Sequence, residues 1–376
     1  MSSPPPQMKK TSAVTPCKTM RGHTGEIFGV AHLPDGKRTI TCSYDSSLRL
    51  WDIESGEQIG EEWRDEGDKS EIRAMALSPN GKDIASGSVD GTVKLWDVET
   101  GKVVHKWKAH PEWVKSVCWS PNGERVVSGS NDGTTRVWDA KSGEPVQGLN
   151  PMKGHEFVSA VSYSPKAKMI ATGVQREEIE IWDAKTGKRL STIKLYEEVH
   201  SLAWTTDENK LIAGLRGSIK ILDTATWQQI ADLDGHQPET GDDERHGNPV
   251  YSLTLFPNNR FLASTSSDKT VRLWNLDNNR QVGPPLQHED TVECAAFSAD
   301  GKLLSTGCQD KNAYVWDICA ILKAAGLEDL LSMPDVQNSE VKKKMYVLPF
   351  SDLETDSDVD ISGQCYPTST HPSNPT

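Results

Sequence analysis

The stretch VKSVCWSPNGERVVSGSNDGTTRVWD, residues 114–139, decides the fold. It opens with an apolar alternation and then meets the turn Ser-Pro-Asn-Gly at 120–123. A run of β-branched and small residues follows at 126–130, and a second tight turn, Asn-Asp-Gly, stands at 131–133 before the strand that ends at Trp138. A helix would need apolar residues at three- and four-residue steps. Short alternating runs separated by such turns instead predict consecutive β-hairpins.

The same pattern recurs along the chain. Its third strand ends in a Trp-Asp pair or a close variant of one, at intervals of 45, 42, 44, 40, 52 and 42 residues. The seven copies end at Trp51-Asp52, Trp96-Asp97, Trp138-Asp139, Trp182-Asp183, Leu222-Asp223, Trp274-Asn275 and Trp316-Asp317. A period of this length is typical of the four-stranded blades of a β-propeller. The 376 residues therefore indicate one repeat domain and not two or three separate ones.

These repeats resemble those of the WD-repeat family over residues 13–317. The resemblance implies an all-β, seven-bladed propeller in which each sequence repeat is offset from the structural blade. The ring would then close through an N-terminal strand, expected at 13–20, that completes the last blade. Such closure removes the exposed sheet edges that otherwise pair with other chains.

Four repeats carry a histidine, a hydroxyl and an aspartate at fixed distances before the tryptophan. The distances are 28, 10 and 6 residues. The four sets are His23, Thr41, Asp45 and Trp51; His110, Ser128, Asp132 and Trp138; His246, Ser264, Asp268 and Trp274; and His288, Thr306, Asp310 and Trp316. In the sixth repeat His246 has this spacing, whereas His236 carries the Gly-His dipeptide that also occurs in the first repeat, at Gly22-His23, and in the fourth, at Gly154-His155. The sequence leaves both histidines open.

A histidine, a carboxylate and a hydroxyl also form catalytic triads. A catalytic constellation is built once, in a cleft, whereas this set is complete four times. The resemblance implies instead a buried hydrogen-bonded tetrad that ties the strands of a blade together. The other repeats depart from the set: Asp68 stands for histidine in the second and Arg176 for aspartate in the fourth. The fifth repeat has Leu195, Ile212, Arg216 and Leu222 at the four positions.

In WD-repeat proteins partners most often meet the top face of the propeller, through three positions in each repeat. The side chains of binding type at these positions are Phe28, Tyr44, Arg73, Trp113, Lys115, Phe157, His200 and Tyr251. Aromatic and arginine side chains are enriched at binding hot spots, and we expect the five aromatic ones to face solvent. Arg73, Arg176 and Arg216 form a second candidate site, for a phosphorylated or acidic peptide.

The sequence thus predicts a non-catalytic scaffold or adaptor that assembles a complex through its top face, with proteins or peptides as partners. One alternative is the phosphopeptide-reading subunit of a ubiquitin ligase, with the ligase-linking domain on a second chain. Another is a component of an RNA-processing or chromatin assembly, and a third is a propeller hydrolase. A nucleotide-binding loop, a nucleophile elbow and metal-ligand spacing are all missing from the sequence, so no cofactor or metal is expected.

Composition and charge limit the classes of binding partner and the cellular compartments that we expect. The net charge of −13 argues against general binding of nucleic acid backbones. The seven cysteines include no Cys-x-x-Cys pair, and no stretch is long enough for a signal peptide or a membrane span. We therefore expect an intracellular protein, cytoplasmic or nuclear, with a monomeric propeller.

Beyond the repeats, residues 318–332 carry apolar residues at helical spacing and predict an amphipathic helix. Residues 1–12 and the acidic, Pro- and Ser-rich segment 333–376 are expected to be disordered, because they hold too little apolar surface to fold alone.

Overall fold

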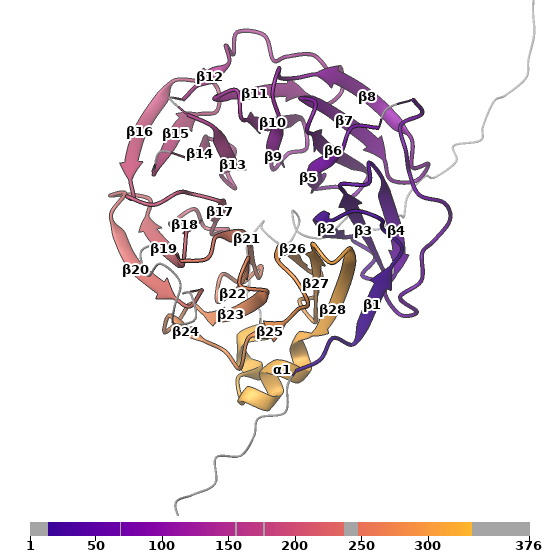
Figure 1. Ribbon diagram of the computed structural model, residues 1–376. Helices are drawn as coiled ribbons and strands as arrows, with labels where there is room; N and C mark the ends of the chain where they lie inside the picture. The colour runs from indigo at the N-terminus through magenta and orange to yellow at the C-terminus, as the bar shows by residue number, and fades with distance from the viewer. Residues whose placement is uncertain (1–13, 68, 155, 176, 237–246, 333–376) are drawn as a thin grey trace, which may run out of the picture. The chain divides into compact units, whose positions relative to one another are not determined.

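The computed structural model describes residues 14–67, 69–154, 156–175, 177–236 and 247–332. Within them, seven antiparallel sheets stand around a central axis as the blades of a propeller (Figure 1). Each blade is a meander whose first strand lies nearest the axis. These inner strands are β2 (Ile27–His32), β5 (Ile72–Leu77), β9 (Val114–Trp119), β13 (Val158–Tyr163), β17 (Ser201–Trp204), β21 (Val250–Leu255) and β26 (Val292–Phe297).

The second and third strands of the blades are the most regular. The second strands are β3 (Arg38–Ser43), β6 (Asp83–Ser88), β10 (Arg125–Ser130), β14 (Met169–Val174), β18 (Lys210–Gly214), β22 (Phe261–Ser266) and β27 (Leu303–Cys308). The third strands are β4 (Leu48–Asp52), β7 (Thr92–Asp97), β11 (Thr134–Asp139), β15 (Glu178–Asp183), β19 (Ser218–Asp223), β23 (Thr270–Asn275) and β28 (Asn312–Asp317). The Trp-Asp pairs therefore end the third strands, as the repeat predicts.

The outer strands vary most. They are β8 (Val103–Lys108), β12 (Met152–Lys153), β16 (Arg189–Lys194), β20 (Gln229–Asp234) and, in the sixth blade, two short pieces, β24 (Arg280–Gln281) and β25 (Leu286–Gln287). In the first blade the outer position is held by two isolated bridges, Leu48 with Trp63 and Trp51 with Gln58.

The outer strand of the seventh blade is β1 (Lys18–Arg21), from the other end of the chain. It pairs antiparallel with β28, Lys18 opposite Val315 and Arg21 opposite Asn312. Met20 on this strand is fully buried among Trp51, Ala313 and Val315. Both ends of the repeat region thus share one sheet, within the part of the chain where the closing strand was expected.

Apolar residues fill the space between neighbouring blades. One core cluster, for example, packs Val93 and Leu95 of the second blade against Val114, Trp119 and Val126 of the third. Since each blade packs one face against each neighbour, both faces of its strands are buried, and the buried residues run nearly without interruption.

The turns between strands depend on glycine. Gly123 and Gly133 both adopt the left-handed backbone conformation, with φ of +73° and +76°. At Gly91, also left-handed, an added Cβ would lie 2.0 Å from the carbonyl oxygen of His110. The loop entering the third blade therefore packs directly on the turn of the second blade, and only glycine leaves room for it.

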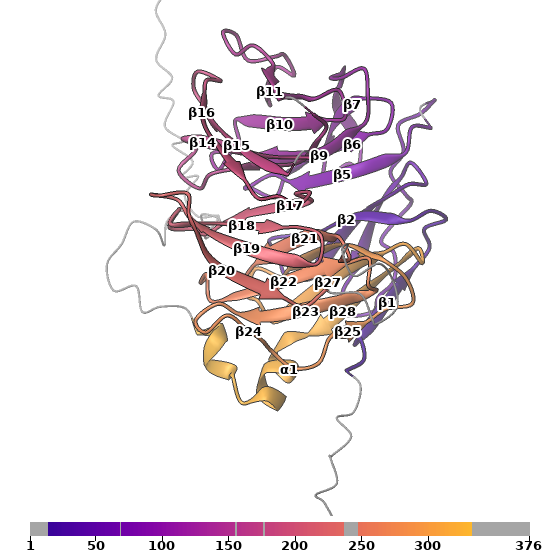
Figure 2. The same ribbon diagram turned by 60° about the vertical axis from the view of Figure 1, so that its left-hand side comes forward.

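The predicted helix over 318–332 is shorter than expected. The α-helix α1 covers Ile318–Ala325 and ends because Gly326 takes a left-handed C-cap, with φ of 68°. A 3-10 helix, η1 (Glu328–Leu331), follows. Figures 1 and 2 show α1 against the outer edge of the last two blades, where Ile321 and Leu322 join the same buried cluster as Val282 and Leu286. The helix covers the propeller's own side.

Candidate functional site

The tetrads of the first and third blades form as hydrogen-bonded chains. In the first blade, Trp51 Nε1 donates to Thr41 Oγ1 at 2.8 Å, and His23 Nε2 lies 2.7 Å from the same oxygen. His23 Nδ1 lies 2.8 Å from Asp45 Oδ2. A carboxylate accepts only, so His23 Nδ1–H donates to Asp45, and the hydroxyl proton of Thr41 is left to bond Nε2.

The third blade repeats this geometry. His110 lies 2.9 Å from Asp132 and 2.8 Å from Ser128, whose oxygen also accepts from Trp138 Nε1 at 2.9 Å. Burial lowers the pKa of both histidines, while the hydrogen bonds from His110 and Thr134 lower the pKa of Asp132 despite its partial burial. Every polar group of the set is satisfied by another member of the set or by an adjacent turn.

In the sixth blade the histidine is His236 and not His246. His236 Nδ1 lies 2.7 Å from Asp268 Oδ2 and its Nε2 lies 2.9 Å from Ser264 Oγ, the oxygen to which Trp274 donates. The assignment of His246 from its spacing is therefore wrong, because the position is filled; His246 itself lies outside the described residues. The physical reason is that additional residues between His236 and the inner strand change the sequence spacing but not the positions of the strands that carry the tetrad.

The seventh blade lacks one hydrogen bond of the tetrad, the one between the histidine and the aspartate. His288 Nε2 lies 2.8 Å from Thr306 Oγ1, but its Nδ1 is 3.1 Å from the carbonyl oxygen of Leu286. The hydroxyl of Tyr314 donates to Asp310 instead. The expected pairing of His288 with Asp310 is wrong here, because the tyrosine ring stands edge-on to the imidazole, with centroids 5.1 Å apart, and takes the carboxylate.

The incomplete repeats keep part of the network. Trp96 donates to Ser86 at 2.8 Å and Trp182 to Thr172 at 3.0 Å. Asp68 and Arg176 lie outside the described residues, as does His155, the histidine of the fourth repeat. In the fifth blade Leu195, Ile212 and Leu222 are all buried, so apolar packing replaces the polar chain.

The tetrads are therefore internal. The histidines at their centres are buried, at 6 % exposed for His23, 2 % for His110 and 1 % for His236. A substrate could not reach them without opening a blade. The described residues also hold no group of three or more His, Cys, Asp or Glu side chains that could bind a metal ion.

A different set of side chains converges on the central channel at the top face. We define the top face as the face where the inner strands begin and where the turn between second and third strands packs on the residue before the inner strand. Examples of this packing are Asn131 N donating to Trp113 O at 3.0 Å and Gln175 N donating to Phe157 O at 3.1 Å. The first, second, sixth and seventh blades make the corresponding contact.

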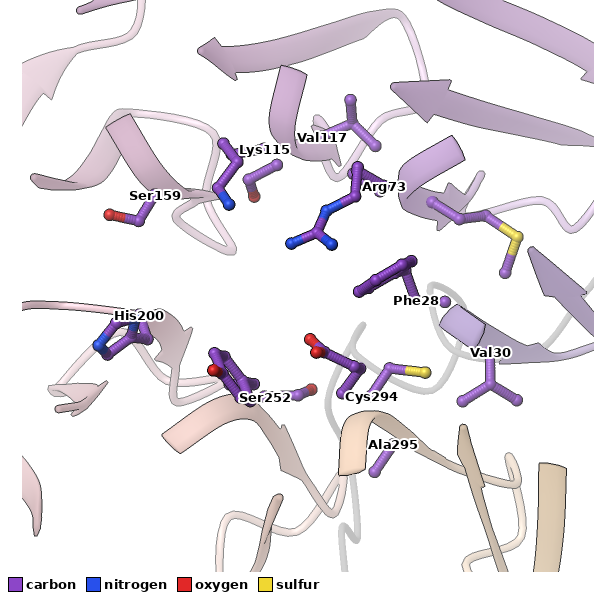
Figure 3. Close-up of a pocket in the computed structure, with 16 residues that line it drawn as sticks. Phe28, Val30, Arg73, Lys115, Val117, Ser159, His200, Ser252, Cys294 and Ala295 are labelled. Carbon is purple, nitrogen blue, oxygen red and sulfur yellow. The ribbon is translucent and has the colours of Figure 1, made fainter. Parts of the chain in front are cut away.

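The channel opens there into a cavity of about 250 Å³ (Figure 3). Each blade contributes to it one side chain from the start of its inner strand or the residue just before. The seven are Phe28, Arg73, Lys115, Ser159, His200, Tyr251 and Glu293. We call them the channel ring. Five of the seven belong to the binding residues predicted from the sequence. Ser159 and Glu293 occupy the same top-face positions in their repeats but were not selected, because their side chains are not of the type enriched at binding hot spots.

Charges in the channel ring lie close together. The guanidinium carbon of Arg73 stands 3.8 Å from the centroid of the Phe28 ring and 6.0 Å from that of Trp113. Lys115 Nζ lies 5.8 Å from the Trp113 centroid. Burial lowers the pKa of Lys115, and the positive charge of Arg73 lowers it further. Burial raises the pKa of Glu293, whose carboxylate accepts from Gln309 Nε2 at 2.6 Å.

The five aromatic residues that were predicted to face solvent differ in their exposure. Trp113 and Phe157 are 39 % and 48 % exposed, in the loops that enter β9 and β13. Phe28 was expected to face solvent, and this is wrong: it is 8 % exposed, because Arg73 covers its face and Tyr44 packs edge-on against it at 5.9 Å. Tyr44 and Tyr251 are half-buried. Tyr196, 78 % exposed in the loop before β17, was not foreseen, because it stands outside the repeat's recognised positions.

The three candidate arginines do not share one environment. Arg73 belongs to the channel ring, whereas Arg216 lies 3.9 Å from Glu198 and donates to the carbonyl oxygen of Gly247. Glu198 also lies 3.6 Å from His200, whose pKa burial lowers. Arg176 is outside the described residues. Arg73 is thus joined in the ring by Lys115 and not by a second described arginine.

Fold, tetrads and channel together define the class. The protein is a β-propeller whose blades are held by buried tryptophan-linked polar networks and whose central channel opens into a small cavity. Residues 14–52, 101–139, 227–275 and 283–317 match the family described as WD domain, G-beta repeat. Residues 59–115 and 148–207 match the anaphase-promoting complex subunit 4 WD40 domain family. The chain belongs to the WD-repeat family.

The chain is also similar to parts of curated WD-repeat proteins. Over 144 residues, 35 % of this chain and 40 % of the relative, it is 29 % identical to the probable cytosolic iron-sulfur protein assembly protein 1 of Kluyveromyces lactis. It is 32 % identical over 124 residues, 32 % of this chain, to the WD repeat and SOCS box-containing protein 1 of Danio rerio, of which 27 % is covered. The matches thus span less than half of these relatives' lengths. In the described part of this chain no helix has the length and apolar character of a membrane span.

Proposed function

We propose that this propeller is a non-catalytic scaffold that binds other proteins through its top face. The observation that carries the proposal is the exposure of Trp113 and Phe157 at the entrances to adjacent inner strands, beside the channel ring. Large aromatic side chains gain free energy when they leave water, and they are common at the centres of protein interfaces. The histidines, aspartates and hydroxyls that might suggest catalysis are engaged in the tetrads instead.

Affinity purification of the full chain, read by mass spectrometry, tests this proposal. The variant Trp113→Ala/Phe157→Ala is expected to lose at least one partner that the wild type retains. The matched control is Leu190→Ala/Ile230→Ala, which removes apolar side chains of similar exposure, 54 % and 52 %, from the outer strands β16 and β20. Equal partner profiles for the wild type and both variants would refute binding through the top face.

A phosphopeptide-reading role in a ubiquitin ligase is the second candidate, in line with the similarity to a protein named for its SOCS box. One observation supports it: the guanidinium of Arg73 has no hydrogen bond or ion pair with a carboxylate among the described residues. A triple Arg73→Ala/Arg176→Ala/Arg216→Ala variant tested on peptide arrays with and without phosphate separates the two. Loss of phosphate-dependent binding alone would favour the second candidate. For the RNA-processing and chromatin alternative, nuclease treatment during purification tests whether partners are held through nucleic acid.

A further inference from the structure

The channel ring contains two neighbouring cations that contact aromatic rings but have no ion-pair or hydrogen-bond partner in the described part of the chain. Arg73 and Lys115 extend from β5 and β9 toward the middle of the cavity (Figure 3). Neither forms a hydrogen bond or ion pair with any other described residue. Two other largely buried lysines do form ion pairs: Lys94 lies 3.1 Å from Asp65, and Lys220 lies 3.0 Å from Glu197. Arg73 and Lys115 differ from these two lysines in having no described carboxylate within ion-pair distance.

Unpaired like charges in a partly dehydrated cavity disfavour each other. The effect is visible in Lys115, since burial and then the charge of Arg73 lower its pKa. An anion between the two cations would replace this repulsion with two attractions, and it would be screened less by salt than at an open surface.

We propose that the cavity lined by the channel ring, which we call the channel mouth, binds a single carboxylate between Arg73 and Lys115. The carboxylate is the side chain of an acidic residue in a peptide segment of a partner protein. This inference rests on the proposed function and names the chemistry that the top face recognises. The carboxylate lies on the side of the channel formed by the second and third blades, which carry Arg73 and Lys115 beside Trp113.

The charge of the ring favours a carboxylate over a phosphate. Glu293 lines the same cavity and lies close enough to both cations for each to favour its ionised form. When Glu293 is ionised, the two cations leave one net positive charge, which one carboxylate neutralises. A phosphate dianion would leave an excess negative charge in a cavity of about 250 Å³.

The orientation of Arg73 also fits a planar acceptor. The guanidinium is stacked on the Phe28 ring at 3.8 Å, so its face is covered while N–H groups on its edge remain free to donate. A carboxylate can accept two such bonds side by side. Because Phe28 already restricts the arginine, less side-chain freedom is lost on binding.

The dimensions of the site indicate a peptide and not a small free acid. The cavity is smaller than the usual pockets for drug-sized ligands and takes a single side chain. Trp113 borders both cations and is exposed beyond them, and Phe157 is exposed at the next blade. An apolar residue adjacent to the acidic one in the peptide would therefore cover these rings.

Peptide display followed by calorimetry tests the proposal. A random 12-residue peptide library is selected on the full chain, and the enriched sequence is synthesised with its acidic residue kept, replaced by Gln, or replaced by phosphoserine. We expect enrichment of Asp or Glu beside an apolar residue. The Gln peptide should bind at least about tenfold more weakly, since hydrogen bonds to charged groups are the stronger ones. The phosphoserine peptide should not bind more tightly than the carboxylate.

The protein variants complete a double-mutant cycle. In Arg73→Gln/Lys115→Gln the acidic peptide and the Gln peptide should bind equally, whereas the control Lys153→Gln, at an exposed lysine on β12, should keep the tenfold difference. Unchanged melting temperatures show that both variants fold. A tenfold difference that persists in the double variant would overturn the proposal, as would tighter binding of phosphoserine.

The inference and the proposed function can fail separately. Peptides without an acidic residue, whose binding is lost in Trp113→Ala/Phe157→Ala, would leave the top face as an interaction surface and remove the carboxylate site. Failure of the wild type to enrich any peptide, together with identical partner profiles for the top-face variant, would remove both.

Discussion

His236 and Asp268 are joined at 2.7 Å across 32 residues of sequence, whereas His23 with Asp45 and His110 with Asp132 are joined across 22. The ten additional residues fall between the histidine and the inner strand of the sixth blade. The tetrad nevertheless keeps the distances of its counterparts. The polar network is therefore set by the positions of the strands, and the loop that leads from the histidine to the inner strand can lengthen without altering it.

Replacement of His236 by Ala is expected to reduce the free energy of unfolding by about 1–3 kcal/mol, because Asp268 and Ser264 would each lose a buried partner. Urea unfolding followed by tryptophan fluorescence measures this change. His246→Ala is the matched control and should leave the unfolding midpoint unchanged within error. A larger loss in His246→Ala than in His236→Ala would contradict the assignment.

The fold could be predicted from the sequence because its signals are local and repeated. Turns such as Pro121-Asn122-Gly123 and the closing Trp138 recur with little variation, and each repeat supports the same interpretation. The assignment of His246 was wrong because a fixed spacing assumes loops of constant length. The Gly-His dipeptide that His236 shares with His23 was the better indicator in this repeat.

The channel mouth was harder to predict, because its residues come together only when seven separate repeats close into a ring. The repeat pattern places Glu293 on the top face but does not show that it shares a cavity with Arg73. Burial of Phe28 likewise depends on Arg73, which comes from a different blade. Pattern reasoning identifies which residues begin an inner strand, but it does not give the packing between them.

The hydroxyl of Tyr314 is expected to stabilise the seventh blade. Tyr314→Phe removes its hydrogen bond to Asp310 and leaves that half-buried carboxylate with fewer partners. We expect a loss of about 1–3 kcal/mol in the free energy of unfolding. Tyr44→Phe is the control, since the hydroxyl of Tyr44 makes no hydrogen bond to the other described residues. Equal unfolding midpoints for the two variants would mean that Asp310 does not depend on Tyr314.

Strand β1 should be required for full stability. Met20 is completely buried on it, so Met20→Ala is expected to cost about 2–5 kcal/mol, and removal of residues 1–21 more, because the backbone pairing with β28 is lost as well. Differential scanning calorimetry of the truncated chain, compared with a chain lacking only residues 1–13, measures the contribution of the strand itself. Equal melting temperatures for the two truncations would show that the ring does not need this strand.

His32 is expected to make the propeller sensitive to acid. The ring is 8 % exposed, and neither of its nitrogens has a hydrogen-bond partner among the described residues. Burial lowers the pKa of His32 to about 4, although the negative charge of Asp300 favours the protonated form. The unfolded chain, with an ordinary histidine pKa of about 6.5, takes up a proton first as the pH falls. The contribution of neutral His32 to the free energy of unfolding is therefore fully present above pH 6.5. It is lost between about pH 6.5 and pH 4, a decrease of about 3 kcal/mol.

The variant His32→Leu tests this directly, because leucine already stands at the same place in two other blades, as Leu77 and Leu255, the last residues of β5 and β21. Urea unfolding of the wild type and the variant at pH 7.5, 6, 5 and 4.5 gives the difference in free energy at each pH. We expect the advantage of the variant to grow as the pH falls, since only the wild type must bury a ring that the solvent would protonate. Acidic groups such as Asp45 also weaken the fold at low pH, but they act equally in both proteins and cancel in the difference. Parallel curves over this range would show that His32 is not the group that titrates.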